Sequence, residues 1–129
     1  MMRYVLDASA IIALLLDEPG AAEVRAVLTQ SCICAVNLAE VVAFFAKGGA
    51  SRAKIEHMLK DLPSAIVSAD SELSFANGML RPLTVSTGLS LGDRYCLALA
   101  QREGATALTA NRPWAKAGVT TGIPVRLIR

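Results

Sequence analysis

The chain alternates short β-rich runs with amphipathic helical segments from one end to the other. Strands separated by helices are typical of a parallel sheet that carries helices on both faces. The runs predicted to be strands lie at 4–6, 32–35, 65–67, 107–109 and 125–128. This order predicts an α/β fold and determines which polar residues can come together.

Helical periodicity fills the intervals between these runs. After the second run, apolar residues at i, i+3, i+4 and i+7 outline a helix face that ends at Gly48 and Gly49. A helix over 52–62 is expected to end before Pro63, and one over 70–81 to stop at Pro82. Further helices are predicted over 10–16 and 21–28, and from Leu91 to near residue 104.

The length of 129 residues fits one domain, which we expect to span 1–129. A folded chain of this size buries about two thirds of its surface, which is enough for a core without metal or disulfide staples. Mean hydropathy is +0.46 and 19% of the residues are charged. These values exclude a disordered chain.

Charge and cysteine usage narrow the functional classes. The net charge of +2 is too small to indicate a nucleic-acid binder by bulk electrostatics, so local placement must decide. Cys32, Cys34 and Cys96 are expected to be small buried side chains in a reducing cytosol. The apolar stretch 8–16 is bracketed by acids and is far shorter than the ~20 residues that span a bilayer, so we expect a soluble cytoplasmic protein without a membrane segment.

Four polar residues fall where a parallel sheet would gather them. Asp7 ends the first strand, Glu40 and Asp93 lie in the first turns of two helices, and Asn111 follows the fourth strand. In open α/β sheets, ligands bind at the carboxyl ends of the strands. These residues are distant in sequence, and the fold is expected to bring them to one edge.

Each of these residues also has a structural explanation. Asp7 is a good helix cap, Asn37 with Glu40 resembles a capping box, and Ser90 with Asp93 matches that spacing even better. Asn111 would similarly cap a short turn. Taken one at a time, capping is the better interpretation, because it is so common at such positions.

Their joint occurrence favours a metal site instead. Carboxylates that share one site repel each other, and protons or a cation must stabilise them. Oxygen ligands favour Mg²⁺ or Mn²⁺ over zinc, and such an ion attracts a phosphodiester. The sequence offers no glycine-rich phosphate loop, and its only histidine, His57, lies in a polar helix that cannot support a Ser/His/Asp triad.

Four motifs carry a resemblance to a known family: YVLDAS at 4–9, NLAEV at 37–41, LSLGDR at 89–94 and LTANR at 108–112. Their order and spacing closely resemble the PIN-domain ribonucleases, most strongly the toxin half of bacterial VapBC toxin-antitoxin pairs. The resemblance implies a three-layer α/β/α sandwich with a central five-stranded parallel sheet. It also implies Mg²⁺- or Mn²⁺-dependent endonucleolytic cleavage of RNA, a homodimer, and a cognate antitoxin that wraps the toxin and blocks its site.

The resemblance assigns the family's three leading acids to Asp7, Glu40 and Asp93. It implies that Asp7 and Asp93 hold the metal, while Glu40 coordinates through water or takes a proton from the attacking water. Ser9 and Thr109 match the hydroxyls that orient the carboxylates or the scissile phosphate.

The chain departs from the family at Asn111, where a fourth catalytic acid is usual. An amide keeps a carbonyl oxygen for a metal or its water but removes one negative charge. One firmly held ion, weaker binding of a second and reduced activity are the expected consequences.

Cationic and aromatic residues border the expected site. Arg94, Arg112 and Lys116 are candidates for binding RNA phosphates, with ordinary surface charge as an equally open interpretation. Trp114 is a candidate for stacking on a base, whereas Tyr95 lies on an apolar stripe.

Two other functions are compatible with parts of this pattern. Asn111 keeps open a metal-impaired fold that binds an antitoxin or RNA without nuclease activity. A phosphotransfer domain, either a receiver or a haloacid-dehalogenase-type phosphatase, also has an Asp at the end of its first strand. The phosphatase needs a second Asp where this chain has Ser9, and a receiver needs an acidic pair and a late Lys that are not found.

Overall fold

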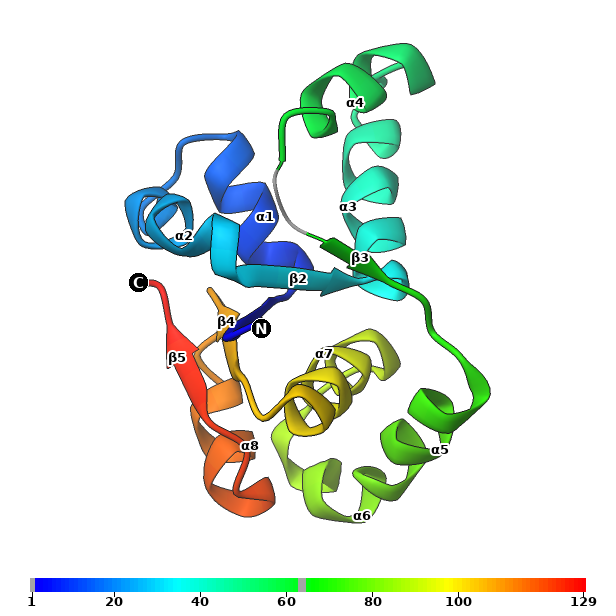
Figure 1. Ribbon diagram of the computed structural model, residues 1–129, viewed down its shortest axis with the longest axis vertical. Coiled ribbons are helices and arrows are strands. Elements are labelled where there is room, and N and C mark those ends of the chain that lie inside the picture. Colours follow the sequence, from blue (N-terminus) through cyan, green and yellow to red (C-terminus); the bar gives the residue numbers. More distant parts are fainter. Residues whose placement is uncertain (1, 63–64) are drawn as a thin grey trace.

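The computed structural model describes residues 2–62 and 65–129. In this part of the chain, five parallel strands form one sheet in the order β3-β2-β1-β4-β5 (Figure 1). The strands are β1 (Tyr4–Leu6), β2 (Ser31–Cys34), β3 (Ala65–Val67), β4 (Thr106–Thr109) and β5 (Val125–Leu127). The expected five-stranded parallel sheet is confirmed, and β1 lies at its centre.

Both faces of the sheet are covered, as the alternation of side chains along a strand requires. Val5 and Cys34 belong to one buried cluster, whereas Leu6, Ile33 and Leu108 belong to the other. The two clusters pack against different sets of helices. The molecule is therefore a three-layer sandwich.

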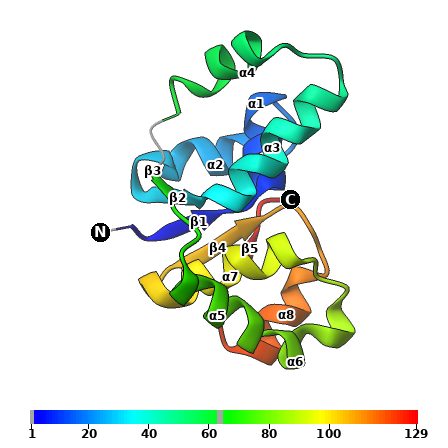
Figure 2. The ribbon, with the colours of Figure 1, turned by 90° about the vertical axis from the view of Figure 1, so that its right-hand side faces the viewer.

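The first helical layer follows the chain from β1 to β3, and the second follows it from β3 to β5 (Figures 1 and 2). The first layer consists of α1 (Ala8–Leu15), α2 (Ala21–Val27), α3 (Ala35–Lys47) and α4 (Arg52–Leu59). The second consists of α5 (Ser71–Met79), α6 (Arg81–Thr84), α7 (Leu91–Glu103) and α8 (Trp114–Thr121). Two short 3₁₀ turns, η1 (Leu28–Gln30) and η2 (Val85–Thr87), join the elements.

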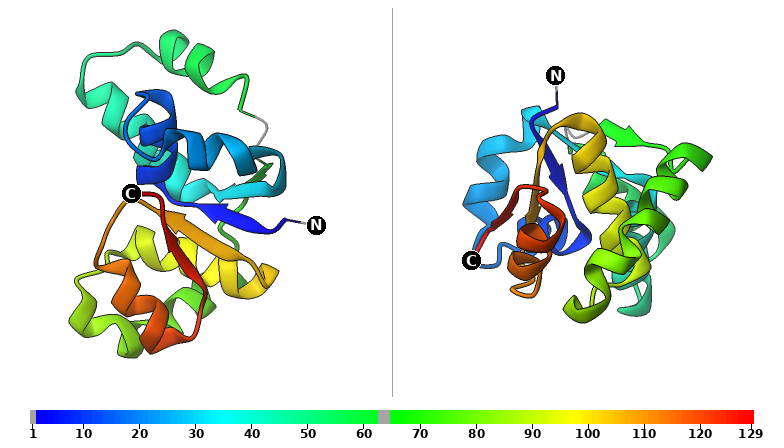
Figure 3. Two further views of the ribbon diagram at one scale, coloured as in Figure 1. Left: turned by 90° about the vertical axis from the view of Figure 1, so that its left-hand side faces the viewer. Right: turned by 90° about the horizontal axis from the view of Figure 1, so that it is seen from below.

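Helices α3 and α4 form an arm that extends away from the sheet (Figure 3). Gly48 caps the end of α3, which confirms the predicted stop at this glycine pair. Gly49 then adopts a positive φ of 94°, a conformation that glycine reaches without strain. The chain therefore turns sharply between α3 and α4.

Two predicted helix ends were wrong. The helix predicted to stop at Pro82 ends at Met79, and a new helix, α6, begins at Arg81 with Pro82 inside its first turn. Proline is tolerated there because the amides of a first turn have no intrahelical partner. The helix predicted over 52–62 ends at Leu59, and Pro63 lies outside the described residues.

The predicted burial of the cysteines is confirmed, since Cys32, Cys34 and Cys96 are all free and buried. Burial raises the pKa of the Cys32 thiol to about 11, and it also raises the pKa values of the other two thiols. Within residues 2–62 and 65–129, no helix has the length and apolar character needed to cross a membrane.

Candidate active site

Asp7 is the most buried acid at the carboxyl edge of the sheet, with 2% of its surface exposed. It follows β1 directly and caps α1, because its Oδ1 accepts a hydrogen bond of 2.8 Å from the Ala10 amide. The Ser9 hydroxyl donates to the same oxygen at 2.7 Å, and the Thr109 hydroxyl donates to Oδ2 at 2.6 Å. Capping thus holds the carboxylate in place and leaves one lone pair of Oδ2 free.

Ser9 and Thr109 are themselves held by the loop that follows β4. Ser9 Oγ accepts from the Ala110 amide at 2.9 Å, and Thr109 Oγ1 accepts from the Asn111 amide at 3.0 Å. Each hydroxyl therefore donates its proton to Asp7 and accepts a hydrogen bond from a backbone amide. This is the arrangement that an orienting role for the two hydroxyls requires.

Within the described residues, no ion pair is found for Asp7. Its pKa is raised from 3.8 to about 6, mainly by burial; the Thr109, Ser9 and Ala10 hydrogen bonds lower it, and the charge of Asp93 contributes to the rise. Desolvation outweighs three hydrogen bonds here because water is almost completely excluded.

Glu40 approaches the same edge from α3. Its Oε1 accepts a hydrogen bond of 2.7 Å from Asn37 Nδ2, which also donates to the Gly92 carbonyl at 3.1 Å. Burial of the carboxyl group raises the pKa of Glu40, the Asn37 hydrogen bond lowers it, and the charge of Asp93 raises it. The charge of Asp93 therefore lies near enough to raise the pKa values of both Asp7 and Glu40.

The capping box expected at Asn37 and Glu40 was wrong. Helix α3 begins at Ala35, so Asn37 lies inside its first turn and is 1% exposed. Asn37 donates to the carbonyl of Gly92, 55 residues later, and the spacing of neighbouring residues in the sequence cannot reveal such a contact. The role of Asn37 was therefore missed from the sequence.

Asp93 caps α7 as the sequence predicted. Ser90 Oγ accepts from the Asp93 amide, and Asp93 Oδ2 accepts from the Ser90 amide at 2.8 Å, which completes a capping box. Its second oxygen makes no hydrogen bond within the described segments. Capping and membership of the acidic site are therefore compatible for this residue.

Three of the remaining predicted site residues, Asn111, Arg112 and Lys116, follow β4 in the chain. Asn111 is exposed, and its backbone, not its side chain, makes the hydrogen bonds found in the described structure. Arg112 and Lys116 are also exposed and follow the same loop. The structure therefore joins Asn111 to Thr109 but does not bring its amide side chain onto Asp7.

Arg94 is held by Asn77, a residue that was not predicted from the sequence. Its Nε donates to Oδ1 of the buried Asn77 at 3.3 Å, and Asn77 Nδ2 donates to the Leu91 carbonyl at 3.0 Å. Arg94 takes part in none of the ion pairs found within the described residues, 2–62 and 65–129. Its positive charge is thus oriented by a neutral acceptor and not neutralised by an acid.

The expectation that Trp114 stacks on a base was wrong. Its side chain is 0% exposed and packs in the core beneath α8, so no base can reach it. Its Nε1 is buried without a hydrogen-bond partner in the described part of the chain. Trp114 is therefore a structural residue.

The donor set of this edge consists of hard oxygens. No three His, Cys, Asp or Glu residues of the described chain lie close enough together to form a ready-made metal cluster. Mg²⁺ does not need such a cage, because it keeps several waters and binds proteins through one or two carboxylates. The Asp7 Oδ2, which accepts a single hydrogen bond in the described structure, the nearby charge of Asp93 and the raised pKa values of Asp7 and Glu40 therefore fit a hydrated divalent ion.

Comparison with protein families finds one matching model, described as the PIN domain, which covers residues 4–119. The match spans all four motifs of the sequence analysis. No curated protein matches the sequence.

Solved structures match over nearly the full chain. DNA-bound VapBC from Salmonella typhimurium gives a TM-score of 0.79 at 17% identity and covers 100% of both chains. A toxin-antitoxin complex from Klebsiella pneumoniae gives 0.73 at 21% identity over 98% of both chains. FitAcB from Neisseria gonorrhoeae gives 0.73 at 17% identity over 95% of both chains. At these identities the likeness establishes the shared fold.

Proposed function

The chain belongs to the PIN domain family, and on that basis we propose that it is a Mg²⁺- or Mn²⁺-dependent endoribonuclease, the toxin of a toxin-antitoxin pair. The observation that carries the proposal is the buried Asp7 carboxylate, which two hydroxyls hold in place and which responds to the charge of Asp93. A purely structural cap gains nothing from a second acid nearby, whereas a metal ligand does.

Each acid has its own part in the proposal. Asp7 offers its free Oδ2 lone pair, and Asp93 offers the oxygen that its capping box leaves unused. Glu40 binds through water or takes the proton of the attacking water. When bound, the ion lowers the pKa of that water and neutralises charge on the phosphoryl oxygens.

The RNA backbone is proposed to lie along the surface of α7 and the loop after β4. Arg94, oriented by Asn77, and the exposed Arg112 and Lys116 supply positive charge beside the acids. Exposed Asn111 stands where the family usually has an acid, so binding of a second ion is expected to be weaker.

Incubating the purified chain with structured RNA tests the proposal. We expect cleavage with Mg²⁺ or Mn²⁺, none with EDTA, and none for Asp93→Asn, because that change removes a charge but keeps the shape of the cap. Cleavage that survives both controls comes from a contaminant. A wild-type chain that binds RNA but cuts nothing with either metal contradicts the nuclease proposal and favours a binding module.

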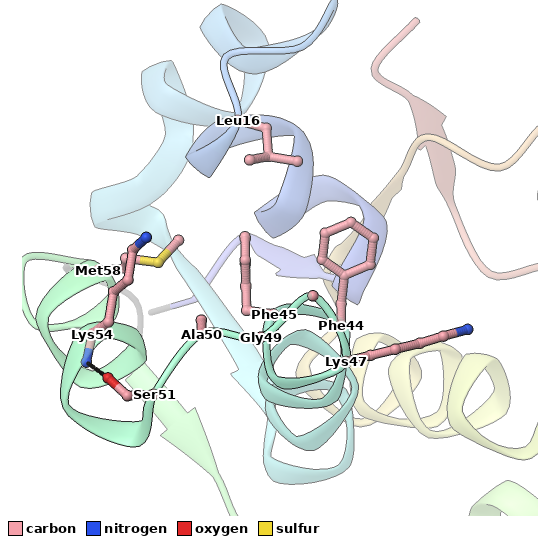
Figure 4. Close-up of a pocket in the computed structure, with 10 residues that line it drawn as sticks. Leu16, Phe44, Phe45, Lys47, Gly49, Ala50, Ser51, Lys54 and Met58 are labelled. Atoms are coloured by element: carbon pink, nitrogen blue, oxygen red, sulfur yellow. Dashed lines mark hydrogen bonds between the residues drawn. The ribbon is translucent and has the colours of Figure 1, made fainter.

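The antitoxin partner is proposed to dock on a groove between α1, α3 and α4 (Figure 4). The groove has a volume of about 990 Å³, and Figure 4 shows Phe44 and Phe45 projecting from α3 toward Leu16, with Met58 approaching from α4. Within the described chain, its lining contains two lysines, Lys47 and Lys54, and no acidic residue. An amphipathic segment with apolar anchors and acidic neighbours suits this surface.

The groove lies one helical turn from Glu40 along α3. Phe44 lies four residues after Glu40 on α3, and residues at that spacing are neighbours on one helix face. A segment seated on Phe44 therefore extends to the carboxylates within one helical turn. One of the matching structures is a toxin-antitoxin complex, which supports an antitoxin as the occupant.

Charge reversal tests the docking surface. The double change Lys47→Glu and Lys54→Glu is expected to weaken binding of the antitoxin encoded beside this gene by about tenfold, while RNA cleavage stays unchanged. Lys60→Glu, at the C-cap of the helix that carries Lys54 but outside the groove, is the control. Equal antitoxin affinity for the wild type and the double variant places the partner elsewhere.

A homodimer in the cytoplasm completes the proposal. Phe75, Met79 and Leu83 form an exposed apolar stripe along α5 and α6, with 78%, 68% and 47% of their surfaces exposed. Burying such a stripe against a second copy removes apolar surface from water. This stripe is therefore the proposed dimer surface.

A further inference from the structure

Two local departures from ordinary helix design meet at Glu40. The first is the buried amide of Asn37, whose Nδ2 donates to both Glu40 Oε1 and the Gly92 carbonyl. Its Oδ1 has no hydrogen-bond partner within residues 2–62 and 65–129. An unpaired buried oxygen costs stability, so the Asn37 amide lowers the stability of the folded protein.

The second departure is Gly92, which lies inside the first turn of α7. Its φ is not in the left-handed region, so its backbone does not require glycine. Glycine in a helix costs stability relative to alanine. A Cβ at this position would lie 2.6 Å from Glu40 Oε2 and 2.8 Å from Cδ, so the Glu40 carboxylate occupies the space that any other residue would fill.

The two features act on different sides of one group. Asn37 holds Oε1 through a neutral donor, which leaves the negative charge of Glu40 intact, while Gly92 lets the carboxylate lie flat against α7. No other hydrogen bond to this carboxylate is found in the described part of the chain. Departures from local stability rules that converge on one side chain indicate a functional constraint.

We propose that Asn37 and Gly92 are positioning residues for Glu40, which fix its carboxylate against the start of α7 for the cleavage step. The proposal rests on the nuclease function, because it assigns to these residues the placement of a group that acts in it. Neither residue touches the reacting atoms.

Gly92→Ala tests the proposal, with Gly78→Ala as its matched control. Gly78 is also a helical glycine with an ordinary φ, and a Cβ there meets nothing within 4 Å. Both variants are expected to keep or raise the melting temperature. Gly92→Ala is expected to lower kcat for RNA cleavage by about 10–100-fold with KM within threefold of the wild type, whereas Gly78→Ala leaves both unchanged.

Asn37→Ala gives a second route, and a double-mutant cycle shows whether both residues act through Glu40. In a Glu40→Asp background the shorter side chain no longer reaches Gly92, so adding Gly92→Ala should lower kcat by less than threefold. An equal loss in both backgrounds, or a Gly92→Ala variant as active as Gly78→Ala, overturns the proposal. If Gly92→Ala does not fold, full activity of Asn37→Ala overturns it.

Titration with Mn²⁺ separates this proposal from the proposed function. We expect Gly92→Ala to bind Mn²⁺ more weakly than Gly78→Ala, by about tenfold in calorimetry. If the wild type binds Mn²⁺ but cuts no RNA, the nuclease proposal fails while this comparison still reports on Glu40. Equal Mn²⁺ affinity of the two alanine variants then overturns the positioning proposal.

Discussion

Replacing Asp7 with asparagine is expected to reduce RNA cleavage by about a thousandfold while making the metal-free protein more stable at neutral pH. The loss of rate follows because a bound divalent ion contributes several kcal/mol to the transition state, and each 1.36 kcal/mol is a factor of about ten. The asparagine keeps the cap on α1, since its Oδ1 still accepts from Ser9 and Ala10.

The gain in stability follows from the raised pKa of Asp7. With a pKa of about 6 in the folded protein and 3.8 as its ordinary value, the buried carboxyl group holds its proton more tightly when folded. Its contribution to stability is fully present below pH ~4 and is lost as the pH rises to about 6. The loss is about 3 kcal/mol, because one pKa unit corresponds to ~1.4 kcal/mol.

Urea unfolding in EDTA at pH 4.5 and pH 7.5 measures this effect, with Asp61→Asn at an exposed acid as the control. The wild type and Asp61→Asn should lose stability over this interval, and Asp7→Asn should lose clearly less. An Asp7→Asn variant that cleaves RNA as fast as the wild type contradicts the role given to Asp7. So does an Asp7→Asn variant that loses as much stability as the wild type between pH 4.5 and pH 7.5.

Trp114→Ala is expected to destabilise the protein by about 3–5 kcal/mol, which is a large part of the 5–15 kcal/mol typical of a domain. Trp114 is fully buried at the start of α8 and packs against the cluster that holds β1 and β4. The cavity left behind would loosen the turn from Thr109 to Asn111, and cleavage should fall together with stability.

Thermal and urea unfolding measure this effect. Val119→Ala, on the same helix but 84% exposed, should change stability by less than about 0.5 kcal/mol. Trp114→Phe should cost less than the alanine change, because it keeps most of the volume and removes the unpartnered Nε1. A Trp114→Ala variant as stable as Val119→Ala would show that this packing contributes little.

The sheet and the helix caps at Asp7 and Ser90 could be predicted because they depend on local patterns. Strand and helix periods gave the order of elements, and Ser90 with Asp93 formed the box that their spacing indicated. The helix start at Arg81 and the burial of Trp114 were not predicted in this way. Both depend on how distant segments pack, which overrides local preference.

The candidate site divides along the same line. The family resemblance implied that Ser9 and Thr109 orient a carboxylate, and both donate hydrogen bonds to Asp7, because the parallel sheet aligns the ends of β1 and β4. Asn37 and Gly92 could not be found, because their interaction depends on how closely α3 approaches α7.

The central place of β1 in the sheet has a consequence for biosynthesis. β1 pairs with β4, and the Asp7 carboxylate receives a hydrogen bond from a residue 102 positions later. A ribosome making this chain therefore holds an unfinished pocket until Thr109 has emerged. The cleavage that we propose for this pocket has to wait for the same moment.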